Sequence, residues 1–257
     1  MASPSFPEPA RGFALLEAWI ALVVLAILFG GLALPLAAQV QMRRQEALER
    51  QLEEARDALM GFAAAQGRLP CPATPSSGGA EAFAPGGDAS NGACADYYGG
   101  FLPAATLGVR GVDDEGFARD PWASRENRLR YAVFGGTVNG VASPLTRTDG
   151  VREATLSALG ASHYLFICAS GREASGAGCG PASRQLTRRA AFVVLSRGPN
   201  AASPPAAGSD EARNLDGDAV FVSREASMSP GDPFDDTLLW VPIHLLAHRL
   251  IVAGRLP

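Results

Sequence analysis

The chain of 257 residues begins with a long apolar stretch, which is its strongest pattern of hydrophobic and polar positions. From Ala18 to Ala38 there are 21 residues without a charged side chain. As an α-helix this stretch is about 31 Å long, close to the ~30 Å thickness of the hydrocarbon layer of a bilayer. The pattern predicts a transmembrane helix within residues 13–40.

The next stretch has the pattern of an amphipathic helix. Apolar residues recur there in steps of four and three, which places them on one helix face: Leu48, Leu52, Ala55, Leu59 and Phe62. Helix-forming residues continue to Gln66, and Gly67 and Pro70 predict the end of the helix. We therefore expect one helix from Phe13 to Gln66, with a membrane half and an amphipathic half.

The rest of the chain alternates short apolar runs with loops rich in glycine and proline. Runs rich in β-branched and aromatic residues predict the strands of a small antiparallel sheet: Leu129–Phe134, Tyr164–Ala169, Ala191–Ser196, Val220–Ser223 and Leu238–Val241. Pro242 fits the first turn of a final helix through Ile251, and Gly254 predicts its end. No linker divides residues 41–257, so they are predicted to form the amphipathic helix and one globular domain.

Glu17 is an ionisable residue at the start of the apolar run. A carboxylate in such surroundings costs up to about 3 kcal/mol, and less near the membrane surface. A cut between Gly12 and Phe13 would create an amine on Phe13, four residues before Glu17. The positive charge of that amine would offset the cost.

The stretch from Arg11 to Glu17 resembles the N-terminus of type IV prepilins and type II secretion pseudopilins. In that family a leader ends in glycine, phenylalanine follows, and glutamate is the fifth residue of the mature chain; Gly12, Phe13 and Glu17 match these positions. The resemblance implies that residues 1–12 are a leader removed by a prepilin peptidase. It also implies methylation of the Phe13 amine, and pairing of Glu17 with that amine in a neighbouring subunit.

Two features depart from this pattern, and two other interpretations of the N-terminus are open. The leader is less basic than is usual in the family, and Pro35 lies one residue later than the common helix proline. A signal peptide cut after Ala38 is one alternative, although the run is too long for it. An uncut membrane anchor is the other.

Later segments are similar to a group of larger pilin-like proteins. They are Gly67–Pro72, Gly100–Pro103 with Thr106–Gly108, Asp120–Trp122, Leu129–Val133, Phe192–Asn200, and Phe234–Asp236 before Leu239–Trp240. The resemblance implies an α+β fold of the pilin type, in which a long N-terminal helix packs on a small antiparallel sheet with disulfide-held loops. It implies that these segments serve the fold and the assembly of subunits, and it implies no catalytic role for them.

Four cysteines fall into two local pairs, each bracketing a loop rich in small residues. Cys71 and Cys94 form one pair, and Cys168 and Cys179 form the other. Their spacing is not that of a zinc site. Of the three possible pairings the two local ones are favoured, and each disulfide would contribute about 3 kcal/mol by closing its loop. Free buried thiols in a cytoplasmic protein are the alternative.

Charge gives conflicting evidence on topology. Arg11 and the initiator amine precede the apolar run, whereas Arg43 and Arg44 follow it, and this weakly favours a C-terminal part inside the cell. The cysteines and the resemblance favour the opposite. We expect a single-pass protein of the bacterial inner membrane, with its C-terminal domain in the periplasm and with a place in a filament after assembly.

Candidate chemical sites are few. His244 and His248 could share one helix face, but Leu245 stands where a zinc hydrolase motif needs glutamate. The segment Gly208–Asp236 holds acids that could gather oxygen ligands for Ca²⁺: Asp216, Asp218, Asp232, Asp235 and Asp236. Their spacing favours solvated loops, so no metal site is predicted. No nucleophile, phosphate or dinucleotide motif is present, so we expect no enzyme and no cofactor.

The expected function is structural. The resemblance implies a subunit of a type II secretion pseudopilus or a type IV pilus, and the size of its globular part favours a minor component. Its partners would be other pilin or pseudopilin subunits, the prepilin peptidase, the assembly platform and the inner membrane. A net charge of −4 indicates no nucleic-acid partner. A membrane-anchored periplasmic enzyme or binding module is the alternative.

Overall fold

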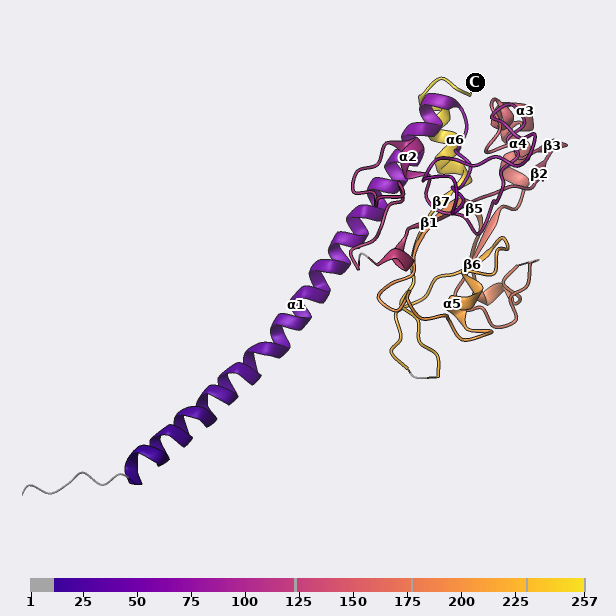
Figure 1. The fold of residues 1–257 in the computed structure, drawn as a ribbon. Helices are drawn as coiled ribbons and strands as arrows, with labels where there is room; N and C mark the ends of the chain where they lie inside the picture. The colour runs from indigo at the N-terminus through magenta and orange to yellow at the C-terminus, as the bar shows by residue number, and fades with distance from the viewer. Residues whose placement is uncertain (1–11, 123, 177, 230, 257) are drawn as a thin grey trace, which may run out of the picture. The chain divides into compact units, whose positions relative to one another are not determined.

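The computed structural model describes residues 12–122, 124–176, 178–229 and 231–256; the side chains of residues 12–14, 28–38 and 125 fall outside this description. The chain divides into two units, Met1–Glu46 and Ala47–Pro257. Helix α1, Gly12–Gln66, begins in the first unit and ends in the second. The second unit, called the globular unit below, contains all other helices and strands that the structure describes (Figure 1).

The predicted transmembrane segment and the predicted location in the inner membrane are both wrong. Among the described residues, no helix combines the length and the apolar character that crossing a membrane requires. The apolar side chains described near the start of α1 extend from Leu15 to Ile27.

The amphipathic stripe of α1 is buried as its spacing predicts. Leu48, Leu52 and Leu59 are 0–2% exposed. They pack with the side chains of one sheet face and of the final helix in one core cluster. Burial of each leucine stabilises the fold by about 1.5–3 kcal/mol. The helix ends where expected, because Gly67 adopts a positive φ of 72° and its amide bonds the carbonyl of Ala63.

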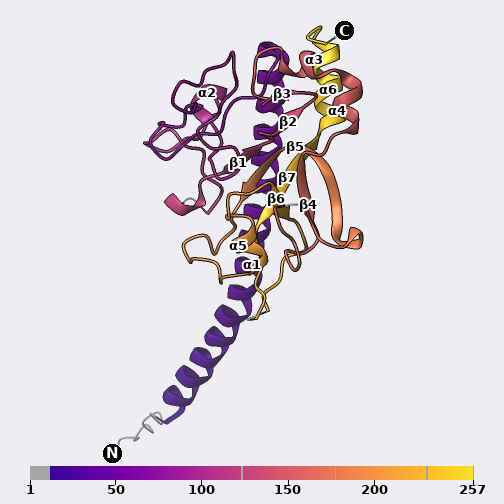
Figure 2. The same cartoon turned by 90° about the vertical axis from the view of Figure 1, so that its right-hand side faces the viewer.

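A five-stranded sheet forms the centre of the globular unit (Figure 2). Its strands are β1 (Arg130–Val133), β4 (Leu165–Cys168), β5 (Gln185–Ser196), β6 (Val220–Val222) and β7 (Thr237–Pro242). Strand β5 pairs antiparallel with β1, β4 and β7, and β6 pairs parallel with β4. All five strands overlap runs that the sequence predicts as strands.

The predicted fold class is wrong because this sheet is mixed rather than antiparallel. The connection from β5 to β6 carries the chain past β4 to its far edge, so that β6 lies parallel to β4. Alternation of apolar residues identifies a strand but does not determine which neighbour it takes. The predicted division of the helix into a membrane half and an amphipathic half fails with the transmembrane segment.

Short elements occupy the connections between the strands. They are α2 (Ala104–Leu107), η1 (Arg125–Asn127), β2 (Thr137–Val138), β3 (Val141–Ala142), α3 (Gly150–Ala154), α4 (Leu156–Ala161), η2 (Ala182–Arg184) and α5 (Asp210–Arg213). Strands β2 and β3 pair with each other. Helix α6, Ile243–Val252, follows β7 directly. Its N-terminal boundary is set by Pro242, which needs no amide partner there.

The two faces of the sheet carry separate apolar clusters. On one face, Tyr131, Phe192 and Val194 pack with α1 and α6. On the other, alternating residues such as Ala132 and Val193 form a smaller cluster. Adjacent residues of a strand point to opposite faces, and this separates the two sets.

The C-terminal tail contacts the end of α1. The guanidinium of Arg255 donates hydrogen bonds to the carbonyls of Ala64, at 3.1 Å, and Ala65. These carbonyls belong to the last turn of α1, where no further helical amide is available to them. The contact joins the two ends of the globular unit's sequence.

Candidate functional site

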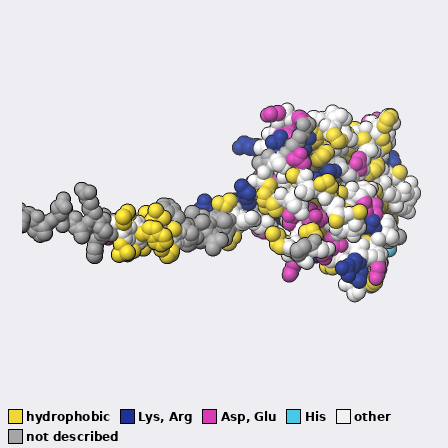
Figure 3. Space-filling model, turned by 60° about the horizontal axis from the view of Figure 1, so that its bottom comes forward, with side chains coloured by type: hydrophobic (Ala, Val, Ile, Leu, Met, Phe, Trp, Pro, Cys, Tyr) yellow, Lys and Arg dark blue, Asp and Glu magenta, His cyan; other side chains and the backbone are white. Residues whose placement is uncertain are grey.

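The described side chains near the start of α1 form an apolar surface, which we call the N-terminal surface. It comprises Leu15, Leu16, Trp19, Ile20, Leu22, Val23, Val24, Leu25 and Ile27, which are 39–75% exposed. Figure 3 shows hydrophobic side chains gathered at the surface of this part of α1. Glu17 lies among them and is itself exposed. A contiguous apolar surface of this kind marks an interaction site.

The predicted processing site can be placed only in part. Residues 1–11 of the expected leader lie outside the described residues. Gly12 is the first residue of α1, and the side chain of Phe13 falls outside the description. The relation of the Phe13 amine to Glu17 is therefore still a prediction.

Both disulfides form between the cysteines that are local in sequence. Cys71 bonds Cys94, and Cys168 bonds Cys179, with Cα–Cα distances of 5.3 and 5.4 Å. This is the pairing that the spacing favoured. All four side chains are buried, so the bonds hold the loops from within rather than at the surface.

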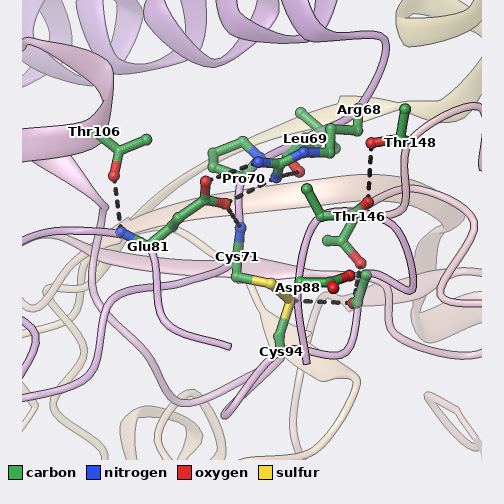
Figure 4. A network of polar contacts seen from close by, with 12 residues as sticks. Arg68, Leu69, Pro70, Cys71, Glu81, Asp88, Cys94, Thr106, Thr146 and Thr148 are labelled. Carbon is green, nitrogen blue, oxygen red and sulfur yellow. Dashed lines mark hydrogen bonds and ion pairs between the residues drawn. A yellow bond between two sulfur atoms is a disulfide. The ribbon is translucent and has the colours of Figure 1, made fainter. Parts of the chain in front are cut away.

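The first disulfide loop is attached to the end of α1 by an ion pair (Figure 4). Arg68 donates two hydrogen bonds to the two carboxylate oxygens of Glu81, at 2.7 and 2.8 Å. The same carboxylate accepts a bond from the amide of Cys71. The paired side chains are 8% and 16% exposed, so solvent screens them little. The arrangement is structural: it fixes the loop that follows Pro70.

A buried polar network lies where β5 ends. The hydroxyl of Ser196 donates to Asp120 at 2.5 Å, and the side-chain amide of Asn127 donates to Asp120 at 3.2 Å. Asn127 also donates to the carbonyl of Gly198 at 2.5 Å. Asp120, Asn127 and Ser196 are at most 3% exposed. Buried polar groups are stable only when paired in this way.

Gly198 permits a close contact between two segments. Its φ is 66°, and a Cβ built on it would lie 2.3 Å from the Oδ1 of Asp235 and 2.6 Å from the carbonyl oxygen of Asp235. Any side chain at this position would clash with that backbone. The segment Ser196–Asn200 therefore lies directly against the segment Phe234–Asp236.

Three carboxylates meet beside this contact. Carboxylate oxygens of Glu211, Asp235 and Asp236 all lie within 4.8 Å of one another. Glu211 accepts bonds from the Asn200 side chain, at 3.0 and 3.2 Å, and from the Asp235 amide at 3.0 Å. Asp236 accepts a bond from Asn214 at 2.8 Å. The cluster joins the loop after β5, the helix α5 and the start of β7.

Burial and mutual repulsion change the acidity of this cluster. Burial, followed by the charge of Glu211, raises the pKa of Asp235 to about 6. Burial raises the pKa of Asp236 to about 7, against the bond from Asn214, and the charges of Glu211 and Asp235 add to the rise. The cluster can therefore hold a proton near neutral pH. Its oxygen atoms are also of the type that divalent cations bind.

The other candidate calcium ligands, Asp216, Asp218 and Asp232, each form an ion pair with an arginine. Asp216 and Asp218 pair with Arg213 at 2.6 and 3.5 Å. Asp232 pairs with Arg224 at 2.7 Å. Each of these carboxylates therefore has a cationic partner, whereas Asp235 and Asp236 of the candidate set belong to the group of three carboxylates.

The two histidines of the final helix lie on its exposed face. His244 and His248 are both exposed, one turn apart on α6. Within the described part of the chain, the one group of metal-ligating side chains is that of Glu211, Asp235 and Asp236. The histidines therefore do not join a ligand set there.

Sequence reasoning missed both the role of Glu211 and the convergence of three segments. Asp120–Trp122, Ser196–Asn200 and Phe234–Asp236 belong to the segments noted for their resemblance, yet no role followed from it. In the structure they form one polar joint. A signal was present, because Ser196 ends an apolar run and a polar residue there needs a partner.

Comparison with known protein families, with curated proteins and with solved structures found no match for this chain.

Proposed function

We propose that the protein is a structural subunit of a pilin-type filament, either a type II secretion pseudopilus or a type IV pilus. The observation that carries the proposal is the N-terminal surface, whose apolar side chains are exposed in the single chain. A helix that exposes such a surface needs a partner to cover it. A second copy of the same helix would supply matching apolar side chains.

The free energy available from this surface is comparable with the cost of association. Full burial of one large apolar side chain contributes about 1.5–3 kcal/mol. Nine such side chains between Leu15 and Ile27, each 39–75% exposed, would together contribute on the order of 10 kcal/mol. This matches the 4–15 kcal/mol estimated for the loss of translational and rotational freedom on association.

Glu17 gives this assembly its register. When copies cover the N-terminal surface, the carboxylate of Glu17 leaves water and needs a cationic partner. Cleavage after Gly12 by a prepilin peptidase would create the amine of Phe13, and a neighbouring subunit would present that amine to Glu17. Assembly would therefore require processing first.

The size of the globular unit, Ala47–Pro257, supports a place as a minor component. Its large loops are fixed by two disulfides, which form in oxidising surroundings. Its proposed partners are other pilin or pseudopilin subunits and the assembly platform of the machine.

Mass spectrometry of the protein purified from its native cells tests this proposal. We expect a chain that begins at Phe13 with a methylated amine, and particles of many subunits after purification. A chain that retains Met1, or one that begins after Ala38, would overturn the proposal. A processed chain that stays monomeric at high concentration would overturn it as well.

A further inference from the structure

The outer face of α6 is basic and apolar. Leu245, Ile251 and Val252 are 42–65% exposed on it. His244, His248 and Arg249 are exposed beside them. From Thr237 to the end of the chain the sequence contains no aspartate or glutamate. This face therefore lacks acidic groups of its own to balance its cations.

A groove runs between this face and the part of α1 in the globular unit. It has a volume of about 450 Å³ and is lined by Arg56, Asp57 and Met60 of α1 and by Leu245 and Arg249 of α6. Arg56 already pairs with Asp57 at 2.9 Å. Within the described residues Arg249 has no ion-pair partner, so its charge faces the groove unbalanced.

The connection between β6 and β7 presents an exposed apolar side chain beside an acidic one. Met228 is 93% exposed on it, the largest exposed fraction among the large apolar residues described. Glu225, three residues earlier, is also exposed. The other acids of the segment Gly208–Asp236 pair with Arg213 or Arg224 or lie in the carboxylate cluster, so Glu225 carries the exposed negative charge beside Met228.

These two surfaces lie at opposite ends of the globular unit. Figures 1 and 2 both show α6 at one end and the connection between β6 and β7 at the other. The two surfaces therefore cannot meet within one chain. Between two copies in the same orientation, however, they can face each other.

We propose that copies of this protein contact each other head to tail, with Met228 of one copy seated in the groove between α1 and α6 of the next. In that contact Glu225 would lie beside Arg249, and the apolar end of Met228 would pack on Met60 and Leu245. Opposite charge on the two surfaces favours this orientation over head-to-head contact. This inference rests on the proposed function, because it concerns the globular units within the filament.

The form of the contact suits a filament. Two different surfaces of the same chain make a heterologous contact, which extends as an open chain when its rotation does not close a ring. A single methionine and one charge pair cover far less than the ~1,000 Å² that a stable interface needs. The contact would therefore act together with the N-terminal surface, which raises the effective concentration of the two partners.

A charge exchange in the full-length processed chain tests the proposal. Glu225→Arg and Arg249→Glu should each lower the association constant about tenfold, measured by sedimentation velocity, because each places like charges together. The double variant should return to within about threefold of the wild type. Met228→Ser should also weaken assembly. The control Leu186→Ser, at an exposed leucine outside both surfaces, should not.

The outcomes separate this inference from the function on which it rests. The control is Arg152→Glu, a charge reversal at an exposed arginine elsewhere on the globular unit. If the wild type assembles, but Glu225→Arg and Arg249→Glu change the association constant no more than this control does, the head-to-tail contact is wrong and the filament proposal stands. The same conclusion follows if the double variant loses as much affinity as the two single variants lose together. That result is expected if an acidic partner of another sequence binds in the groove. If the wild-type processed chain does not assemble at all, both proposals fail.

Discussion

The proton held by the carboxylate cluster leads to a quantitative prediction for the change Asp236→Asn. The pKa of Asp236 is about 7 in the folded protein and 3.8 in the reference state. Because the folded protein binds this proton more tightly than the unfolded chain, the stability that it contributes is complete below about pH 4. That stability is lost as the pH rises toward 7.

The expected change in the free energy of unfolding can be calculated for the pH range from 5 to 8. Between pH 5 and the folded pKa of about 7 there are about two pKa units, each worth 1.36 kcal/mol. The wild type should therefore lose about 3 kcal/mol more of its free energy of unfolding between pH 5 and pH 8 than the Asn variant loses. The side chain of Asp236 is largely buried, at 8% exposure of the residue, so solvent screens this effect little.

Urea denaturation at pH 5, 6, 7 and 8 measures the effect, with both disulfides intact. An asparagine at position 236 can still accept the hydrogen bond from Asn214, so the geometry of the joint should be retained. The matched control is Glu49→Gln on the exposed face of α1, which should change stability by less than about 0.5 kcal/mol at every pH. Parallel pH profiles for wild type and Asp236→Asn would refute the reasoning.

Three further predictions concern assembly and the core. Glu17→Ala should leave processing normal but reduce assembly at least tenfold in a sedimentation assay. The control Glu46→Ala, on the same helix, should assemble normally. Equal assembly of the two variants would exclude a register role for Glu17. Leu59→Ala should lower the free energy of unfolding by about 2–5 kcal/mol, because Leu59 is fully buried in the core, and a loss below 1 kcal/mol in urea titration would contradict its packing. Replacing Cys71 and Cys94 by serine should cost about 3 kcal/mol, and an unchanged melting temperature would show that this disulfide contributes little.

The strands and the final helix could be predicted because each is encoded by a local pattern. The apolar run at Ala191–Ser196 identifies the part of β5 that is buried on both faces. The earlier part of β5, from Gln185, was not predicted because Arg188 and Arg189 are exposed and no apolar run marks it. The short helices α3, α4 and α5 were also missed, since one or two turns carry too few residues to show a period.

Pairing between distant segments could not be predicted from local patterns. The parallel contact of β6 with β4 depends on where a connection of more than 20 residues leads the chain, and no residue in β6 encodes it. The predicted transmembrane segment failed for a different reason. A low charge density indicates an apolar surface, and such a surface is as well suited to protein contacts as to lipid.

The polar joint shows the same limit for the site. Ser196 and Asp120 are 76 positions apart, so the sequence gives no sign that they share a hydrogen bond. The acidic residues Asp235 and Asp236 could be identified as candidates, whereas Glu211 could not be distinguished from the other acids of its loop. Their convergence depends on Gly198, whose missing side chain allows two backbone segments to touch.

The contact of Arg255 with the last turn of α1 has a mechanical consequence. A force that pulls on α1 along its axis would reach the sheet through the apolar packing of α1, and also through this guanidinium into the C-terminal tail, α6 and β7. Strand β7 is hydrogen-bonded to β5 over its whole length, so many bonds would share the load in shear. The C-terminal tail thus gives the end of α1 a second attachment to the sheet, beside the packing of its apolar face.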